Sequence, residues 1–506
     1  MSGKREKGRG KRGLGSVVLI GMLGALALTL PPKAGAQDRY VDLSERYDRP
    51  RLYHEAFALP GDVQPTLVVA FRIPNAMLVF MRAQADVPGG AFVAQAEVVV
   101  EVYQKGERLA EQRWQWTHHA ADFEATQHRE MGIEGHVRFA LNPGFYAYRL
   151  RIQDGNSVRS SELDVRSVRV PDFGGSALGK PMIVEDVQTG GADVRLRLAN
   201  LGGAAPFGQP AQAVVPLGLV PDVRLETTSL GYALYRQEAE LTGRGQPRGE
   251  ATPVRRAGDG TVLPPVEPKP KGPALATGTV AGAAFVPVPP LKEPVPPLKE
   301  EPTEGGALAW SGDALSAKAG YLARIPLGDH LAEGGYVLEM TLQEGAAEAK
   351  PLATLRTSFR VHWRGQPVSL YSPVVAIRNL EFIESRDAVG AMLKGSREER
   401  EARLNAYWAE RDPTPGTVFN ELMAEYYRRV DYAADAFRTG LVPAPDGLQT
   451  DQARVYIVHG PPESVERRFP SPGGVEETWT YADGRQFVFR AATSFDAFEL
   501  ERRGAP

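Results

Sequence analysis

The 506-residue sequence contains no cysteine. This absence excludes disulfide bonds, zinc sites built on cysteine, a thiol nucleophile and an N-terminal lipid-modified cysteine. The sequence also lacks a glycine-rich phosphate-binding loop, a nucleophile elbow and, among its eight histidines, the HExxH spacing of zinc proteases. We therefore expect no cofactor, and no catalytic signature stands out.

Four of the histidines gather in one short region, at His118, His119, His128 and His136. Neighbouring residues of a strand point to opposite faces of a sheet, so the four side chains cannot all converge on one ion. Metal ligands must converge. We expect no metal site.

The first 36 residues differ in kind from the rest of the chain. Six lysines and arginines precede an apolar run over 14–30, and a small-x-small triplet follows at 34–36. This order is typical of a signal peptide that is cleaved before Gln37. The apolar run is at the short edge of the length that a membrane span needs. An uncleaved anchor is therefore the less favoured alternative. We expect an exported protein, periplasmic rather than on the cell surface because no sorting domain is evident after Leu500.

The formal net charge of the whole chain is −3. Removal of residues 1–36 takes away seven basic residues and one acidic residue, which leaves a mature chain of net charge −9. Such a chain disfavours nucleic acid and anionic lipid as main partners. We expect partners among envelope proteins, and no membrane span after signal cleavage.

Residues 37–173 show short alternating segments broken by turn residues, the pattern of an antiparallel β-domain. Alternation over 98–103 and the tryptophans within 114–116 predict one strand pair, and the apolar runs 67–71 and 77–81 predict another. About 130 residues of such strands predict a β-sandwich, which we expect to be Ig-like.

Residues 174–370 are predicted to form a second Ig-like β-sandwich. It carries a faint copy of the strand that closes the first, at a constant offset of 190 residues. Leu141, Gly144, Tyr146, Ile152 and the turn Asp154-Gly155 recur as Leu331, Gly334, Tyr336, Leu342 and Glu344-Gly345. Duplication of one unit and a chance likeness between sandwich strands both explain this pattern.

A segment of different composition interrupts the second β-domain at about 244–306. It is rich in proline and contains two tandem copies of Val-Pro-Pro-Leu-Lys-Glu, which begin at Val288 and Val295. Such a stretch cannot build a core and is expected to be disordered or polyproline II. It is interpreted as a tolerated insertion, with a ligand for a proline-recognising partner or a spacer as the alternatives.

After Tyr371 the period of apolar residues lengthens from two to near 3.6, which predicts a final α+β domain over 371–506. Ser396 and Glu399 have the spacing of a capping box at the start of one helix. A stripe of apolar residues predicts a second helix over about 418–437. Three short strands are predicted over 453–459, 477–481 and 486–490.

The same region carries a series of motifs in order. They are Tyr407-Trp408, 411–417, Asn420-Glu421, 425–430, the pentapeptide Gly447-Leu448-Gln449-Thr450-Asp451, 454–463 and 477–481. Taken together over about 371–500, these motifs resemble the GWxTD domain family of bacterial envelope proteins. The resemblance implies a location and a fold; it implies no reaction, because the family has no established biochemical activity.

Two positions depart from the family pattern. Leu448 stands where the pentapeptide has tryptophan, and 490–494 replace the acidic residue and glycine-rich end expected after the last strand. If either group contacts a ligand in the family, this protein has lost that contact.

The candidate interaction residues all lie in this final domain. They are Arg411, Asp412, Asn420, Glu421, Tyr426, Tyr427, Arg428, Gly447, Thr450, Asp451, His459, Gly460, Pro461, Pro462 and Trp479. In an interaction protein, Tyr426, Tyr427, Trp479 and the loop 440–451 are the expected contacts. A structural interpretation also suffices for Thr450 and Asp451, which can bond loop amides and fix the entry of the strand predicted at 453–459.

An enzyme is the competing class. In a periplasmic hydrolase or carbohydrate-processing enzyme, Asp451, His459, Glu421 and Arg428 would form an acid–base pocket between helix and sheet. Asp451 and Glu421 should then line one cleft. We favour the protein-interaction or structural module, and the positions of these two carboxylates discriminate the two classes.

Overall fold

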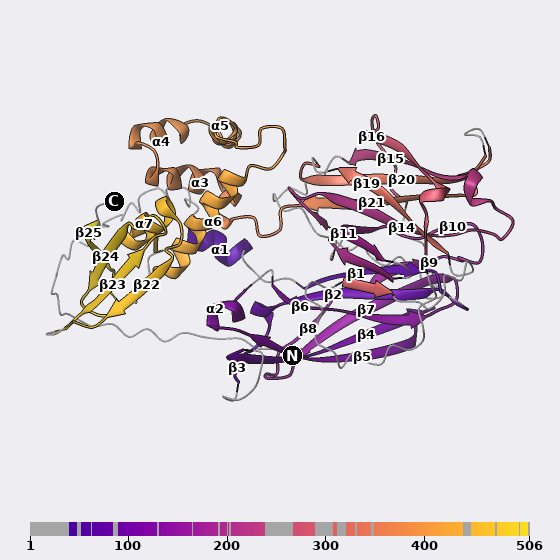
Figure 1. The fold of residues 1–506 in the computed structure, drawn as a ribbon, viewed down its shortest axis with the longest axis horizontal. Helices are drawn as coiled ribbons and strands as arrows, with labels where there is room; N and C mark the ends of the chain where they lie inside the picture. The colour runs from indigo at the N-terminus through magenta and orange to yellow at the C-terminus, as the bar shows by residue number, and fades with distance from the viewer. Residues whose placement is uncertain are drawn as a thin grey trace, which may run out of the picture. The chain divides into compact units, whose positions relative to one another are not determined.

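The computed structural model describes most of the chain from Tyr40 onward. The described residues are 40–47, 52–61, 63–83, 90–128, 131–163, 165–190, 193–199, 201, 204–237, 267–288, 307–310, 320–328, 331–345, 349–438, 447–470, 473–494 and 496–503. Several sheets, almost entirely antiparallel, precede a C-terminal region of helices and strands (Figure 1). The predicted signal peptide lies outside the described residues.

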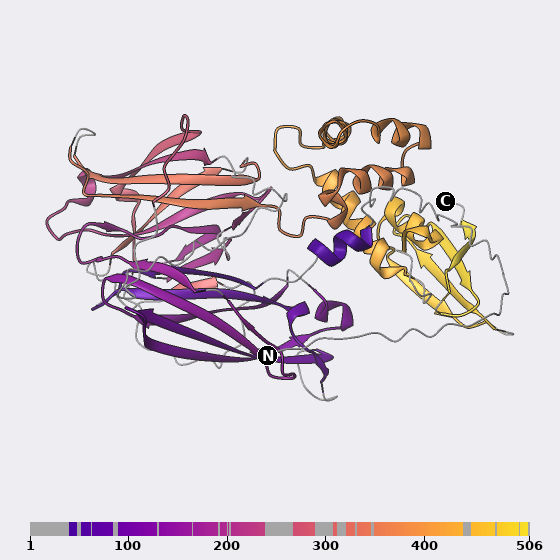
Figure 2. The same ribbon diagram turned by 180° about the vertical axis from the view of Figure 1, so that it is seen from behind.

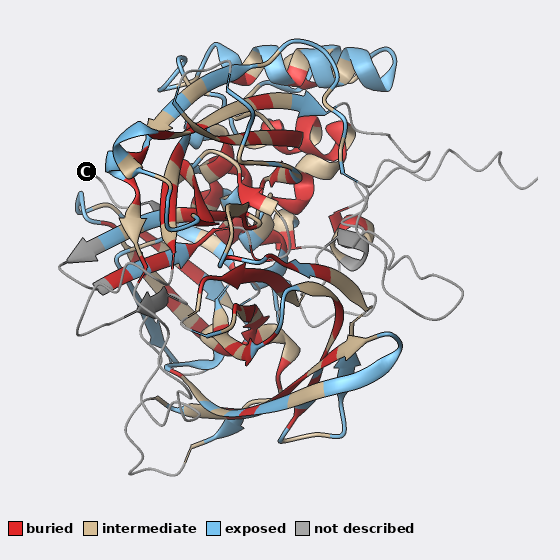
Figure 3. Ribbon diagram, turned by 90° about the vertical axis from the view of Figure 1, so that its right-hand side faces the viewer, coloured by how far each residue is buried: buried red, intermediate tan, exposed pale blue. Residues whose placement is uncertain are grey.

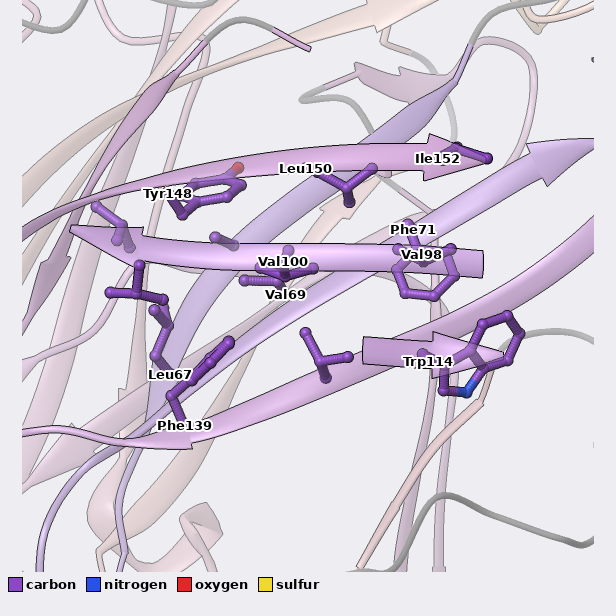
Figure 4. Close-up of a cluster of buried hydrophobic side chains, with 14 of the residues drawn as sticks. Leu67, Val69, Phe71, Val98, Val100, Trp114, Phe139, Tyr148, Leu150 and Ile152 are labelled. Atoms are coloured by element: carbon purple, nitrogen blue, oxygen red, sulfur yellow. The ribbon is translucent and has the colours of Figure 1, made fainter. Parts of the chain in front are cut away.

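Two sheets are built from the strands before Val170. The first has the order β1-β2-β6, from Tyr53–Leu59, Thr66–Pro74 and Gly132–Ala140. The second contains β3 (Met81–Arg82), β4 (Phe92–Gln104), β5 (Glu107–Ala120), β7 (Gly144–Asp154), β8 (Ser160–Glu162) and β9 (Arg166–Val170). One buried cluster takes side chains from both sheets, including Leu67, Val69, Val98 and Val100 (Figure 4). Alternate residues of each strand enter this core, as the period of two requires.

The two strand pairs predicted in this region have different outcomes. The pair over 98–103 and 114–116 is confirmed, since β4 and β5 are antiparallel neighbours. The pairing of 67–71 with 77–81 is wrong, because β2 pairs with β1 and β6 while the short β3 pairs with β4. Buried Asn75 turns the chain away between them: its backbone N–H donates to Met131 O at 2.9 Å, and its side-chain amide donates to Ala125 O at 2.9 Å.

Two further sheets lie between Ala177 and His362. One contains β10 (Ala177–Leu178), β11 (Met182–Gly190), β12 (Asp193–Leu198), β14 (Ala211–Gly218), β17 (Val286–Pro287), β18 (Ala307–Trp310) and β19 (Tyr321–Gly328). The other has the order β13-β21-β20-β15-β16, from Ala204–Pro206, Ala353–His362, Gly334–Glu344, Thr228–Gln237 and Ala276–Ala281. Only β13 and β21 pair in parallel among the described strands. A second buried cluster joins these two sheets.

The strands that carry the sequence repeat start and end at equivalent positions. β7 and β20 are both 11 residues long, and each bound of β20 is the β7 bound shifted by 190. Each is paired on both sides, β7 with β4 and β9, and β20 with β15 and β21. The repeated pattern therefore marks the same structural element twice.

The expectation that the whole proline-rich segment is disordered or polyproline II is wrong for 276–288, which contains strands β16 and β17 and the buried residues Phe285 and Val288. Within the stretch expected to lack regular structure, Ala276–Ala281 forms β16, which pairs with β15 at the edge of its sheet. Strand β16 contains no proline and includes β-branched Thr277, Thr279 and Val280, which suit a strand. Residues 238–266 and 289–306, with most of the tandem copies, lie outside the described residues.

The C-terminal region combines helices with a four-stranded sheet (Figures 1 and 2). The helices are α3 (Pro373–Asn379), α4 (Arg386–Met392), α5 (Arg397–Ala409), α6 (Glu421–Ala436) and α7 (Asp451–His459). The sheet has the order β22-β23-β24-β25, from Ser464–Arg468, Val475–Thr480, Gln486–Ala491 and Glu499–Arg503. The predicted α+β character, the helix near 418–437, the strands near 477–481 and 486–490 and the capping box of Ser396 and Glu399 are confirmed.

The strand predicted over 453–459 is wrong, because this segment is helix α7. Thr450 caps its N-terminus through Oγ1, which accepts from Ala453 N at 3.1 Å, and Gly460 ends it with a φ of 81°. Ala453 and Ile457 face the helical core, while Val455 faces the core of the sheet. A helix buried on two sides shows alternating apolar residues, which imitates the period of a strand. Figure 3 shows how buried positions are distributed over the elements.

Candidate functional site

The pentapeptide forms the junction between α6 and α7. Its first residue, Gly447, opens a short 3-10 turn, η6 (Gly447–Gln449), and its carbonyl accepts from Thr450 N at 3.2 Å and Thr450 Oγ1 at 2.8 Å. A Cβ atom at Gly447 would lie 2.4 Å from Ala433 O, so the position requires glycine. Because Thr450 also caps α7, one hydroxyl ties the turn to the helix.

Asp451 connects this junction to the last strand. Its Oδ2 accepts a hydrogen bond from Leu500 N at 2.8 Å. The register between β24 and β25 shifts beside Leu500, between the pairs Val488–Arg502 and Phe489–Leu500. A register shift leaves ladder groups unpaired, and here a carboxylate accepts from one of them. Thr450 and Asp451 therefore bond a helix and a distant strand, and not the entry of a strand as one interpretation expected.

The candidates between α5 and α6 organise the connection between these helices. Asn420 caps α6 through Oδ1, which accepts from Met423 N at 2.8 Å, while its Nδ2 donates to Trp408 O at 2.7 Å. Asp412 accepts from Thr414 N at 2.9 Å. The guanidinium of Arg411 lies 3.8 Å from the ring centre of Tyr407 and donates to Glu384 at 3.3 Å. Each group is engaged within the domain.

The aromatic candidates are core residues. Tyr426, Tyr427 and Trp479 are all buried, so they are not surface contacts for a partner in this structure. The hydroxyl of Tyr427 donates to Ala376 O at 3.0 Å, and that of Tyr426 donates to Asn379 O. Burial raises the pKa of both phenols, which keeps them neutral donors.

Glu477 lies at the centre of a buried polar network that the sequence analysis missed. Its Oε2 accepts from Gln452 Nε2 at 2.8 Å and from Trp479 Nε1 at 3.3 Å, and its Oε1 accepts from Arg467 Nε at 2.8 Å. The network joins α7, β22 and β23. One feature of the sequence could have indicated that Glu477 is buried. Its neighbours two positions away on the same face of the predicted strand, Val475 and Trp479, are apolar.

The candidates His459, Gly460, Pro461 and Pro462 lie at the C-terminal end of α7 and in the turn that follows it. His459 Nδ1 lies 3.0 Å from Arg485 Nη1, and the imidazole packs against Tyr481 and Phe487. Gly460 accepts the Tyr481 hydroxyl at 3.0 Å, and a Cβ there would lie 3.0 Å from the guanidinium carbon of Arg429. Pro461 is exposed and Pro462 is partly exposed in the turn before β22.

The four residues of the proposed acid–base pocket are not brought together. Glu421 starts α6 and accepts from Thr414 Oγ1 at 2.6 Å, whereas the pentapeptide packs at the other end of that helix, about 18 Å further along the axis. His459 is eight residues after Asp451, about 12 Å along α7. Arg428 is exposed and pairs with Glu425 at 2.6 Å. Asp451 and Glu421 do not share a cleft.

Asp431 of α6 is a second acid that the sequence analysis missed, and its side chain is partly buried. Its carboxylate accepts from Ser369 N at 3.2 Å, from Ser369 Oγ at 2.5 Å and from Val368 N. Burial raises the pKa of Asp431 to about 7, although these three donors favour the charged form. Asp431 thereby fixes η4 (Val368–Tyr371), the turn that leads into α3, on α6.

Strand β22 is the part of the sheet that other elements cover least. All five of its residues are exposed, and among the described strands it pairs only with β23. Val465 and Arg467 stand opposite Trp479 and Glu477, which enter the core beneath α7. The same face is therefore buried in β23 and exposed in β22, where Val465 is 52% exposed; Phe469, just beyond the strand, is 73% exposed.

Residues 369–505 match the family model of the GWxTD domain. The C-terminal region is thus a GWxTD domain, as the motifs predicted.

In the described part of the chain, no helix is long and apolar enough to span a membrane, and no group of acidic residues and histidines could hold a metal ion.

No curated protein matches the chain. Among the solved structures that match, two show how weak the likeness is. The chicken interferon gamma receptor alpha chain is 10% identical, with 62% of this chain and 99% of that chain covered and a TM-score of 0.13. A Salmonella alpha-2-macroglobulin mutant is 9% identical, with 62% of this chain and 21% of that chain covered and a TM-score of 0.13. At these TM-scores the likeness carries no argument.

Proposed function

We propose that this protein is an exported, periplasmic component of a bacterial envelope, in which Ig-like β-sandwich domains carry a GWxTD domain that docks on another envelope protein. The docking surface is the β22 edge, defined here as Ser464–Arg468 with Phe469. The support is a contrast within one domain. The motif residues stabilise the fold, whereas the β22 edge leaves apolar side chains and strand backbone at the surface.

An exposed edge strand presents unpaired backbone donors and acceptors to which an extended segment can add. The opposite edge differs, because the carboxylate of Asp451 bonds the backbone of β25 at Leu500. Phe469 and Val465 supply the apolar anchors that give such a contact its affinity. The β22 edge therefore combines backbone pairing with side-chain specificity.

The charges along β22 indicate the chemistry of the partner. Arg467 is half exposed beside the buried Glu477, and the more exposed Arg468 pairs with Glu466 at 2.9 Å. An extended segment with acidic and apolar side chains in alternation complements this pattern. Charges on an edge also discourage indiscriminate pairing, so the surface favours a specific partner over self-association.

Site-specific photo-crosslinking in intact cells tests this function. A photoreactive phenylalanine analogue replaces Phe469 in one variant and Val158, which is 99% exposed in the N-terminal part of the chain, in a control variant. We expect a defined envelope protein to crosslink at 469 and not at 158. Identical products at both positions, or none at 469 in a correctly exported chain, would overturn the proposal.

A further inference from the structure

The first described helix packs on the GWxTD domain, although more than 300 residues separate them in sequence. Helix α1 (Tyr40–Tyr47) lies beside α6 in both views of the ribbon (Figures 1 and 2). Its Tyr40 and Leu43 are 3% and 2% exposed and share one buried cluster with Val368, Val375 and Ala434. The helix therefore makes an apolar contact with η4, α3 and α6.

The contact also has a polar part. The hydroxyl of Tyr40 lies 3.3 Å from the backbone oxygen of Asp431 and 3.2 Å from Oδ2 of Asp435. A single phenol hydrogen can serve either acceptor, and both lie on the same turn of α6. Tyr40 and Leu43 are three residues apart, so one face of a helix presents both.

The pentapeptide borders the same contact. Leu448 packs against the cluster that contains Tyr40 and Leu43 and also against the helical core of the domain. We call Val368, Val375, Ala434 and Leu448 the α1 seat. Tryptophan in place of Leu448 would add a large ring beside the side chains that hold α1.

Helix α1 depends on this contact for its structure. Helices of eight residues are marginal in water even with favourable sequences, so α1 forms because the α1 seat orders it. Tyr40 and Leu43 anchor an element of only eight residues. Such an element can leave its site while the rest of the domain stays folded.

We propose that the α1 seat is a docking site for a short helix that carries tyrosine and leucine three residues apart, and that α1 is its ligand within the chain. The site recognises the phenol through α6 and the leucine through the apolar residues around Leu448. A segment with the sequence of α1 supplied from outside competes with α1 for it. The α1 seat does not include β22. An experiment that contradicts docking at the β22 edge therefore leaves this proposal unchanged, and the reverse also holds.

A labelled peptide of residues 39–48 tests the proposal on the full mature chain. We expect Leu43→Asp, which weakens the internal ligand, to increase the affinity of the chain for this peptide at least tenfold over the unaltered chain. Adding Val375→Asp to that variant should abolish the binding, and a peptide with Leu43→Asp should bind to none of the chains. Equal affinity for the unaltered and Leu43→Asp chains, or no binding to a folded Leu43→Asp chain, would overturn the proposal.

Hydrogen exchange on the unaltered chain supplies a second readout that needs no destabilising variant. Saturating peptide should displace α1 and speed the exchange of amides in 40–47, without a change in α6. Leu448→Trp should speed exchange in the same segment without peptide. If exchange in 40–47 follows the global unfolding rate under both conditions, α1 is an integral part of the fold and the α1 seat is not a docking site.

Discussion

Tyr146 and Tyr336 make the same hydrogen bond at equivalent places in two strands. The hydroxyl of Tyr146 donates to Asn142 O at 2.8 Å, and that of Tyr336 donates to Ala332 O at 2.6 Å, four residues upstream in each case. Both side chains are buried. A buried tyrosine that bonds back to the preceding backbone is the tyrosine corner of β-sandwiches. The repeat therefore extends from strand bounds to a side-chain hydrogen bond, which duplication of one unit and a likeness common to such strands both explain.

We expect Tyr146→Phe to lower the free energy of unfolding by about 1 kcal/mol, because the Asn142 carbonyl loses its donor. Tyr336→Phe should cost about 1–2 kcal/mol, since the Tyr336 hydroxyl also accepts from Arg236 Nη1 at 2.8 Å. Urea unfolding measures both. Tyr321→Phe is the control, because its hydroxyl has no hydrogen-bond partner among the described residues. Equal losses for all three variants would refute a special role for the corner.

Gly447→Ala should destabilise the GWxTD domain by about 2 kcal/mol or more, because its Cβ would meet the backbone of Ala433 and Phe437. Gly416→Ala is the matched control: a Cβ at this exposed loop position has no atom within 4 Å. Thermal unfolding followed by fluorescence compares the two. A Gly447→Ala chain as stable as the Gly416→Ala chain would show that the junction is looser than the structure indicates.

Asp451→Ala should affect the end of the sheet first. Loss of the carboxylate leaves Leu500 N–H without its acceptor, which costs about 1 kcal/mol, and hydrogen exchange at Leu500 should accelerate. Asp451→Asn keeps an acceptor oxygen and should lose less. Asp496→Ala, which removes an exposed acceptor from Thr493 N at 2.9 Å, controls for loss of a surface carboxylate. Slow exchange at Leu500 in Asp451→Ala would contradict the assigned role.

Asp431 should make stability depend on pH. Burial raises its pKa from 3.8 to about 7, so the folded state holds this proton where the unfolded state has released it. The stabilisation is fully present below about pH 3.8 and is lost as pH rises through 7. Between pH 5 and pH 8 the unaltered chain should therefore lose stability relative to Asp431→Asn, measured by urea unfolding. A constant difference between the two chains would show that Asp431 does not titrate in this range.

Sequence periodicity predicted most of the C-terminal secondary structure and failed at α7. The signals for a helix were present there, because Thr450 precedes the segment, Asp451 lies in the first turn and Gly460 follows the last. The β-branched residues Val455, Ile457 and Val458 outweighed them. Burial between two cores was the deciding factor, and it depends on tertiary contacts that a local pattern does not contain.

The candidate site shows the same limit. The motifs predicted the GWxTD match of the C-terminal region correctly. They did not predict that Tyr426, Tyr427 and Trp479 are buried, because buried and partner-binding aromatics are the same residue types. Asp431 and Glu477 are acids that function structurally inside the domain. Their importance arises from partners distant in sequence, such as Ser369 and Gln452, and not from their neighbours.

The most direct test is crosslinking in intact cells, with two substitutions compared side by side. It asks whether the domain docks through β22 and whether the pentapeptide stabilises the fold. We expect Phe469→Ser to lose its envelope partner, and Asp451→Ala, exported to the same level, to retain it. Loss of the partner in Asp451→Ala together with its retention in Phe469→Ser would contradict the account and place the contact at the pentapeptide.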